Sequence, residues 1–112
     1  MQIQTQGVQT AEFLLTEAPG SLSREQIAVA AGDALPAGQL LEEDAEGIGY
    51  YVPYGTTDDG KAAAILYAPL RASEGKRRAT AIVRLAEVAE ARLTGLDAKA
   101  RTDLLAAFIA VR

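Results

Sequence analysis

A polar turn that runs directly into an apolar strand is the feature that most limits what this chain can fold into. Residues 55–60 read Gly-Thr-Thr-Asp-Asp-Gly, and residues 62–67 read Ala-Ala-Ala-Ile-Leu-Tyr. Asp-Gly tolerates the positive φ angles of a tight reversal, and the run that follows is apolar enough to be buried against another sheet. The pattern predicts a tight turn followed by a buried strand.

Short apolar runs separated by turn signals continue along the chain. The first is the triplet Phe13-Leu14-Leu15, where the folded domain is expected to start and which a Pro19-Gly20 turn closes. The other predicted strands cover residues 23–29, 39–42, 48–54 and 79–83. Pro53 implies a sheet edge or a strand end, because proline cannot donate to a strand ladder. Many short strands of this kind indicate a compact β fold.

The last part of the chain changes to helix-forming residues. Residues 85–93 predict one or two helical turns. Asp97 is placed to cap a second helix over residues 98–108, since its carboxylate can accept from amides of the first turn. Residues 109–112 would follow as a short extended tail.

One face of this second helix is apolar. It carries Ala100, Leu104 and Phe108, which we expect to pack on the sheet. The predicted fold class is therefore mainly β with a C-terminal helix (α+β), in a single compact domain.

The core of such a domain would be thin. The chain has 112 residues and is 49% hydrophobic, but much of that fraction is alanine, and it has two Phe, four Tyr and no Trp. Alanine contributes little buried area, and a domain of this size buries about two thirds of its unfolded surface. A thin core favours oligomerisation as a further source of burial.

The absence of histidine and cysteine excludes several kinds of chemistry. There can be no disulfide, no thiolate or imidazole metal site and no cysteine nucleophile. Catalysis would require carboxylates, lysine or tyrosine. Asp58 and Asp59 are adjacent and would point to opposite sides of an extended backbone, so they are better turn formers than an acid/base pair.

Charge is divided unevenly between the two halves of the chain. Residues 1–59 hold one basic and ten acidic residues (1 − 10 = −9), and residues 60–112 hold ten basic and five acidic residues (10 − 5 = +5), which gives the net charge of −4. Either both halves interleave in one fold and neutralise locally, or they meet head to tail between subunits. A net negative charge argues against binding nucleic acid through its phosphates.

Two charged clusters are candidate sites. The acidic residues Glu42, Glu43, Asp44 and Glu46 predict a solvated hairpin tip, and a calcium site is less favoured because the ligand spacing of a calcium loop is missing. Lys76-Arg77-Arg78 could grip a phosphate, although no glycine cradle accompanies it.

Two further features bear on location and contacts. No apolar run approaches the roughly 20 residues of a membrane span, and the first residues lack a signal-peptide pattern, so we expect a soluble protein made in the cytoplasm, with no membrane partner. Tyr50, Tyr51 and Tyr54 are interpreted as core and edge packing. Residues 1–11 are polar around isolated Ile3 and Val8, which predicts an extended arm able to pair with a sheet edge of a partner.

Four segments, in this order, resemble the head decoration proteins of tailed phages, the family typified by the lambda capsid-stabilising protein D. They are residues 18–23 (Ala-Pro-Gly-Ser-Leu-Ser), residues 37–41 (Ala-Gly-Gln-Leu-Leu), the run from Gly55 to Leu66, and the helix and tail over residues 97–112. The similarity extends over most of residues 13–112.

The resemblance implies a β-clip-like domain over residues 13–112 preceded by an arm over residues 1–12. It implies a homotrimer bound to the major capsid protein at three-fold sites outside the expanded capsid, stabilising the shell, with no enzymatic activity and no cofactor. By analogy the capsid contact falls on the arm, at Ile3, Thr5, Val8 and Thr10. The protein would be made in the cytoplasm of the host bacterium.

Two alternative functions remain open. The β-clip fold also occurs in trimeric dUTPase-like nucleotide hydrolases, whose nucleotide-binding and magnesium-binding motifs do not appear here. A small carrier or binding module could instead present Lys61, which follows the Asp-Gly turn, although the internal repeat of lipoyl-type domains is missing.

Overall fold

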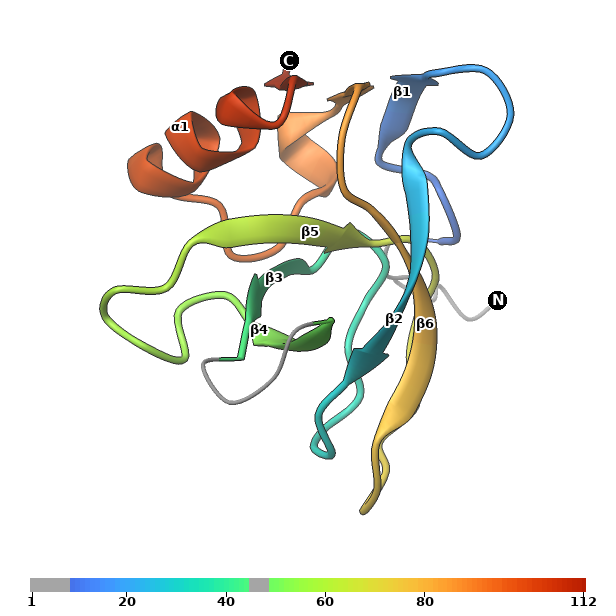
Figure 1. Cartoon of the computed structure of the whole chain (residues 1–112), viewed down its shortest axis with the longest axis vertical. Coiled ribbons are helices and arrows are strands. Elements are labelled where there is room, and N and C mark those ends of the chain that lie inside the picture. The colour runs from blue at the N-terminus through green and yellow to red at the C-terminus, as the bar shows by residue number, and fades with distance from the viewer. Residues whose placement is uncertain (1–8, 45–48) are drawn as a thin grey trace, which may run out of the picture.

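Strands dominate the fold. The computed structural model describes residues 9–44 and 49–112, and within them it contains eight β-strands, one α-helix and one short 3-10 helix (Figure 1). The strands form two sheets, of which the larger closes into a barrel. The predicted class, mainly β with a C-terminal helix in one domain, is confirmed.

Five strands close the barrel in the order β2-β4-β3-β5-β6. Their bounds are Arg24–Val29 (β2), Leu40–Glu43 (β3), Tyr50–Pro53 (β4), Ala62–Leu66 (β5) and Arg77–Ile82 (β6). β2 pairs with β6 along six antiparallel residue pairs, and on its other side it pairs with β4 in parallel. All the strands predicted inside the barrel are present, and Pro53 is the last residue of β4, as the strand-end interpretation requires.

A second, three-stranded sheet lies beside the barrel in the order β1-β7-β8. It is formed by Leu14–Glu17 (β1), Ala86–Val88 (β7) and Ile109–Val111 (β8). β1 is antiparallel to β7, and β8 is parallel to it. Because β7 and β8 are parallel, the chain must cross between them, and it does so through helix α1 (Ala98–Ala106), which contacts β5 and β8 (Figure 1).

The core has two parts that share strand β5. Ala64 and Leu66 point into the barrel, where they pack with residues such as Ile27. Ile65 points the other way, into a second cluster formed with α1 and the small sheet, which includes Phe13 and Leu104. Burial on both faces explains why β5 is apolar at every position rather than alternating.

Helix α1 begins as the sequence predicts and ends earlier. The carboxylate of Asp97 accepts a hydrogen bond from the Ala100 amide at 2.7 Å, which confirms the N-cap, and Ala100 and Leu104 are fully buried. Phe108 was expected on the same buried face, and this was wrong. The helix ends at Ala106, and Phe108 adopts a left-handed φ of 62° with 72% of its surface exposed.

The helical turns predicted for residues 85–93 are only partly present. Residues Ala86–Val88 form strand β7, and the 3-10 helix η1 (Glu90–Arg92) covers the remainder. Leu85 has a φ of 54°, which breaks any helix there, and β7 supplies the central strand between β1 and β8. Tertiary pairing has overridden a local helix preference.

The acidic and basic halves of the chain interleave in one fold. β2, β3 and β4 come from the acidic half, β5 and β6 come from the basic half, and the pairings β2–β6 and β3–β5 join them. Two ion pairs also cross between the halves, Arg84 with Glu25 and Arg92 with Glu12. In the part of the chain that the structure describes, no helix is both long and apolar enough to cross a membrane.

Candidate interaction surfaces

Only one of the four predicted capsid contacts, Thr10, lies within the described residues. Ile3, Thr5 and Val8 lie outside the described residues, and Thr10 is exposed in the turn that leads into β1. This turn is attached to the domain, because the amide of Ala11 donates to the Tyr67 carbonyl at 2.9 Å. Glu12 adds an ion pair to Arg92.

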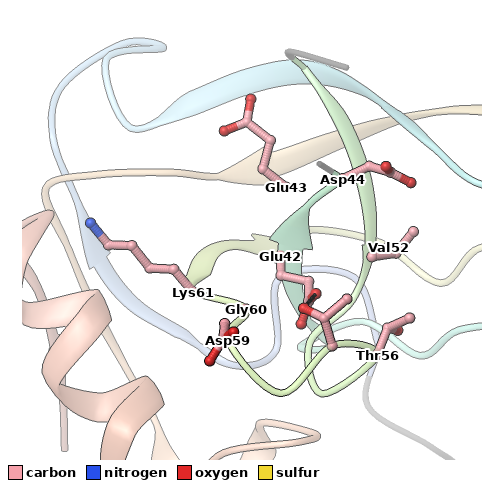
Figure 2. A pocket seen from close by; sticks show the side chains of 9 residues that line it. Glu42, Glu43, Asp44, Val52, Thr56, Asp59, Gly60 and Lys61 are labelled. Carbon is pink, nitrogen blue, oxygen red and sulfur yellow. Dashed lines mark hydrogen bonds between the residues drawn. The ribbon is translucent and has the colours of Figure 1, made fainter. Parts of the chain in front are cut away.

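The acidic cluster lines an open groove of roughly 610 Å³ between β3, β4 and the turn before β5 (Figure 2). Its walls include Glu43, Asp44, Val52 and Asp59. Lys61, the residue of the carrier alternative, is exposed at the rim and extends away from Glu42 (Figure 2).

Glu42 corrects the view of this cluster as a solvated tip, because its side chain is buried and 1% exposed. Its carboxylate accepts from the Gly55 amide at 2.8 Å and from the Thr57 hydroxyl at 2.6 Å. A Cβ at Gly60 would collide with the carboxylate Oε1, so a larger residue there would displace the Glu42 side chain. Glu42 therefore anchors the 55–60 turn internally, with each of its two carboxylate oxygens accepting a hydrogen bond from that turn. Glu46 lies outside the described residues.

The basic cluster is also divided by burial. Arg77 is 9% exposed, and its guanidinium donates to three carbonyls, those of Ala30, Asp33 and Arg71, at 2.7 to 3.1 Å. It fastens the loops at one end of the barrel together, so Arg77 is not free to join the phosphate grip that the three basic residues could have formed. Its neighbours are exposed, and the Lys76 ammonium lies 4.8 Å from the ring centroid of Tyr50.

The tyrosines pack as the sequence predicts. Tyr50, Tyr51 and Tyr54 are all half-buried, in β4 or directly after it. Burial raises the pKa of the Tyr51 phenol above its ordinary value. Burial, followed by the hydrogen bond to Asp97, raises the pKa of Tyr54 in the same direction.

A second surface carries exposed large apolar side chains and was not predicted. The four residues, called here the apolar patch, are Leu22, Leu85, Leu105 and Phe108, which are 43% to 72% exposed. They come from the loop before β2, the residue before β7, the last turn of α1 and the second residue after α1. No local pattern marked this surface, because Phe108 was expected inside the helix. In the structure Phe108 lies directly after the C-cap, a position where glycine is usual.

Comparison with known proteins gives one match. A family model described as Bacteriophage lambda head decoration protein D matches residues 3–111, which is nearly the whole chain. No curated protein and no solved structure matches the chain.

Proposed function

The chain belongs to the bacteriophage lambda head decoration protein D family, and from this membership we propose that it binds the outside of an expanded phage capsid as trimers at three-fold sites. It is a phage head decoration protein, a structural protein of the virion. We further propose that its partner is the major capsid protein, that it stabilises the shell, and that it is made in the cytoplasm of the host bacterium.

One observation carries this proposal, namely the extent of the family match. It runs from residue 3 to residue 111, so it includes most of the segment assigned to the arm as well as the barrel, α1 and β8. A match to the barrel alone would indicate only the fold, and one fold can carry several different functions. Membership in a family of structural virion proteins also favours this function over the nucleotide hydrolase and the Lys61 carrier.

We propose that the arm, residues 1–12, makes the capsid contact, through Ile3, Thr5, Val8 and Thr10. An extended segment can add a strand to an exposed sheet edge, where backbone hydrogen bonds supply affinity with little demand on sequence. The attachment of Ala11 and Glu12 to the domain indicates that the two ends of the arm have different roles. Residues 9–12 orient the arm and add the exposed Thr10 to the contact, and the residues before them make the rest of it.

Decoration of purified heads tests the proposal. Expanded heads of the cognate phage that lack a decoration protein are mixed with the purified chain and imaged by electron cryomicroscopy. We expect density at the three-fold sites, and a higher temperature of capsid rupture than for bare heads. Unexpanded proheads are the matched control and should remain bare. Expanded heads that stay bare at saturating protein would contradict the function itself.

A further inference from the structure

We propose that the apolar patch is the contact between copies of this chain, with Phe108 and Leu85 closest to the three-fold axis. The inference rests on the trimer of the proposed function and names the surface that would form it. Four kinds of observation support it: contiguity, backbone conformation, charge and position.

Hydrogen bonds to backbone carbonyls join the segments of the patch, which come from distant parts of the chain. The Leu85 amide donates to the Ala107 carbonyl at 3.2 Å, and the Phe108 amide donates to the Leu105 carbonyl at 2.9 Å. The Arg84 guanidinium donates to the Leu22 carbonyl at 2.7 Å. The segments that carry the four apolar side chains therefore lie close together, and exposed apolar side chains gathered in this way mark interaction sites.

Two of the four residues have a backbone conformation that costs free energy. Leu85 and Phe108 have φ angles of 54° and 62°, in the left-handed region that bulky residues rarely adopt. Phe108 also occupies the position after the helix C-cap, where glycine would relieve the strain. An exposed phenylalanine gains nothing there in a lone subunit. Strain of this kind concentrates at functional positions, and burial in a partner would offset it.

Charge favours a second copy of the chain as the occupant. Near a three-fold axis, each residue faces the same residue of the neighbouring copies, so an unpaired charge there would meet its like. The cations beside the patch are neutralised within the subunit, Arg84 by Glu25 at 2.8 Å and Arg101 by Glu90 at 2.6 Å. A copy of the patch could therefore approach another without like-charge repulsion.

The charged surfaces lie elsewhere on the molecule. They would place like charges of neighbouring copies opposite each other if they lay at the three-fold axis. The acidic groove has Glu43, Asp44 and Asp59 in its walls. Lys76 and Arg78, at the start of β6, are exposed and have no ion pair among residues 9–44 and 49–112. In Figure 1, α1, β1 and the C-terminus lie together at one end of the molecule, and β6 begins at the other end.

Single-cysteine cross-linking tests the contact, because the chain has no cysteine of its own. Phe108→Cys and the control Lys76→Cys are each treated with a short bismaleimide, in concentrated solution and on decorated heads. We expect covalent dimers for Phe108→Cys and not for Lys76→Cys. No dimer for Phe108→Cys in either setting, on heads that are decorated, overturns this inference and leaves the proposed function standing. If heads stay bare, the function fails, and the reaction in solution still decides the inference.

A second variant separates an interface from a structural role. Phe108→Gly relieves the left-handed backbone, so the free domain should melt at or above the temperature of the parent. The concentration needed to form trimers, measured by sedimentation velocity, should nevertheless rise about tenfold or more. Unchanged association would overturn the inference. A benzophenone maleimide attached to the thiol of the Phe108→Cys variant should capture a second copy on heads, and capture of the capsid subunit instead would assign the patch to the shell.

Discussion

The hydroxyl of Tyr54 donates a hydrogen bond to the carboxylate of Asp97, with 3.0 Å between the phenolic oxygen and Oδ1. The same carboxylate oxygen accepts from the Ala100 amide at the first turn of α1. One side chain therefore caps the helix and ties it to the residue that follows β4. The helix is positioned on the barrel by this carboxylate as well as by its buried face.

Replacing Asp97 should separate its two roles. Asp97→Ala removes the cap and the Tyr54 bond, and should lower the free energy of unfolding by about 1 to 2 kcal/mol. Asp97→Ser can still cap and should recover most of the loss. Tyr54→Phe removes only the second bond and should cost about 1 kcal/mol or less. Urea melts measure all three, and variants that all match the parent would contradict the double role.

Glu42 and Glu43 are adjacent, but we expect stability to depend on the carboxylate of Glu42 and hardly on that of Glu43. Glu42→Gln places a donor amide where the Gly55 amide and the Thr57 hydroxyl already donate, so it should cost about 1 to 3 kcal/mol. Glu43→Gln is the matched control on the exposed side of the strand and should change stability by about 0.5 kcal/mol or less. Equal effects in urea melts would show that the Glu42 carboxylate does not anchor the turn.

Arg77 and Arg78 allow a similar comparison between a buried residue and its exposed neighbour. The buried Arg77 guanidinium donates to three carbonyls from one planar group, and a lysine ammonium cannot reproduce that fork. Arg77→Lys should therefore cost about 2 kcal/mol or more, whereas the exposed Arg78→Lys should be nearly neutral. The comparison needs only thermal melts of the two variants. Two neutral variants would refute the role given to the buried side chain.

The ion pair between Glu17 and Arg24 should make stability fall in acid. Arg24 donates to the Glu17 carboxylate, with 3.0 Å between Nε and Oε2, and this bond holds the pKa of Glu17 below its ordinary value of 4.5. A depressed folded pKa contributes stability above the unfolded pKa, and that contribution is lost as pH falls through the folded pKa.

Urea midpoints of the parent and of Glu17→Gln should consequently differ at neutral pH and converge as the pH falls below the ordinary pKa of 4.5 and through the lowered pKa of folded Glu17. Glu74→Gln, at an exposed position of the loop before β6, is the control for a general charge effect. A difference between parent and Glu17→Gln that stays constant down to low pH would exclude the ion pair as its source.

Removing residues 2–8 should affect attachment and not folding. Residues 9–12 stay in place, so the Ala11 and Glu12 contacts to the domain are retained and the melting temperature should not change. Binding to expanded heads should weaken severely. Thr5→Pro should do part of the same damage, because it removes one backbone donor from the added strand. If the truncated chain binds heads with the affinity of the parent, the contact lies on the folded domain.

Local sequence patterns predicted where helices and strands form better than they predicted which side chains are buried and which strands pair. The Asp97 cap and the apolar strand β5 follow from residues that are close in sequence, and both are present. Burial of Glu42 could not be predicted in this way, because it depends on a turn that begins more than ten residues later. The start of β7 depends on pairing with strands at both ends of the chain, and that pairing overrode a helical preference.

The apolar patch escaped prediction for a related reason. Leu22 is an isolated leucine between two serines, whereas Leu85 and Leu105 belong to runs that resemble core segments. Only the fold brings their exposed side chains to one surface. The contact predicted at Thr10 is exposed, as a binding residue must be, and its role remains a prediction.

The β2–β6 pairing also sets the order in which the protein can form during synthesis. The acidic strands leave the ribosome first, and the barrel cannot close until Ile82 has emerged to pair with Arg24. The small sheet is completed later still, because its strand β7 pairs with β8, which is synthesised after the barrel strands. Folding dominated by such distant contacts is slow, and the nascent chain carries open strand edges until its last residues arrive. A chain that stops before Ile109 would therefore leave strand edges unpaired, and such material is prone to aggregate.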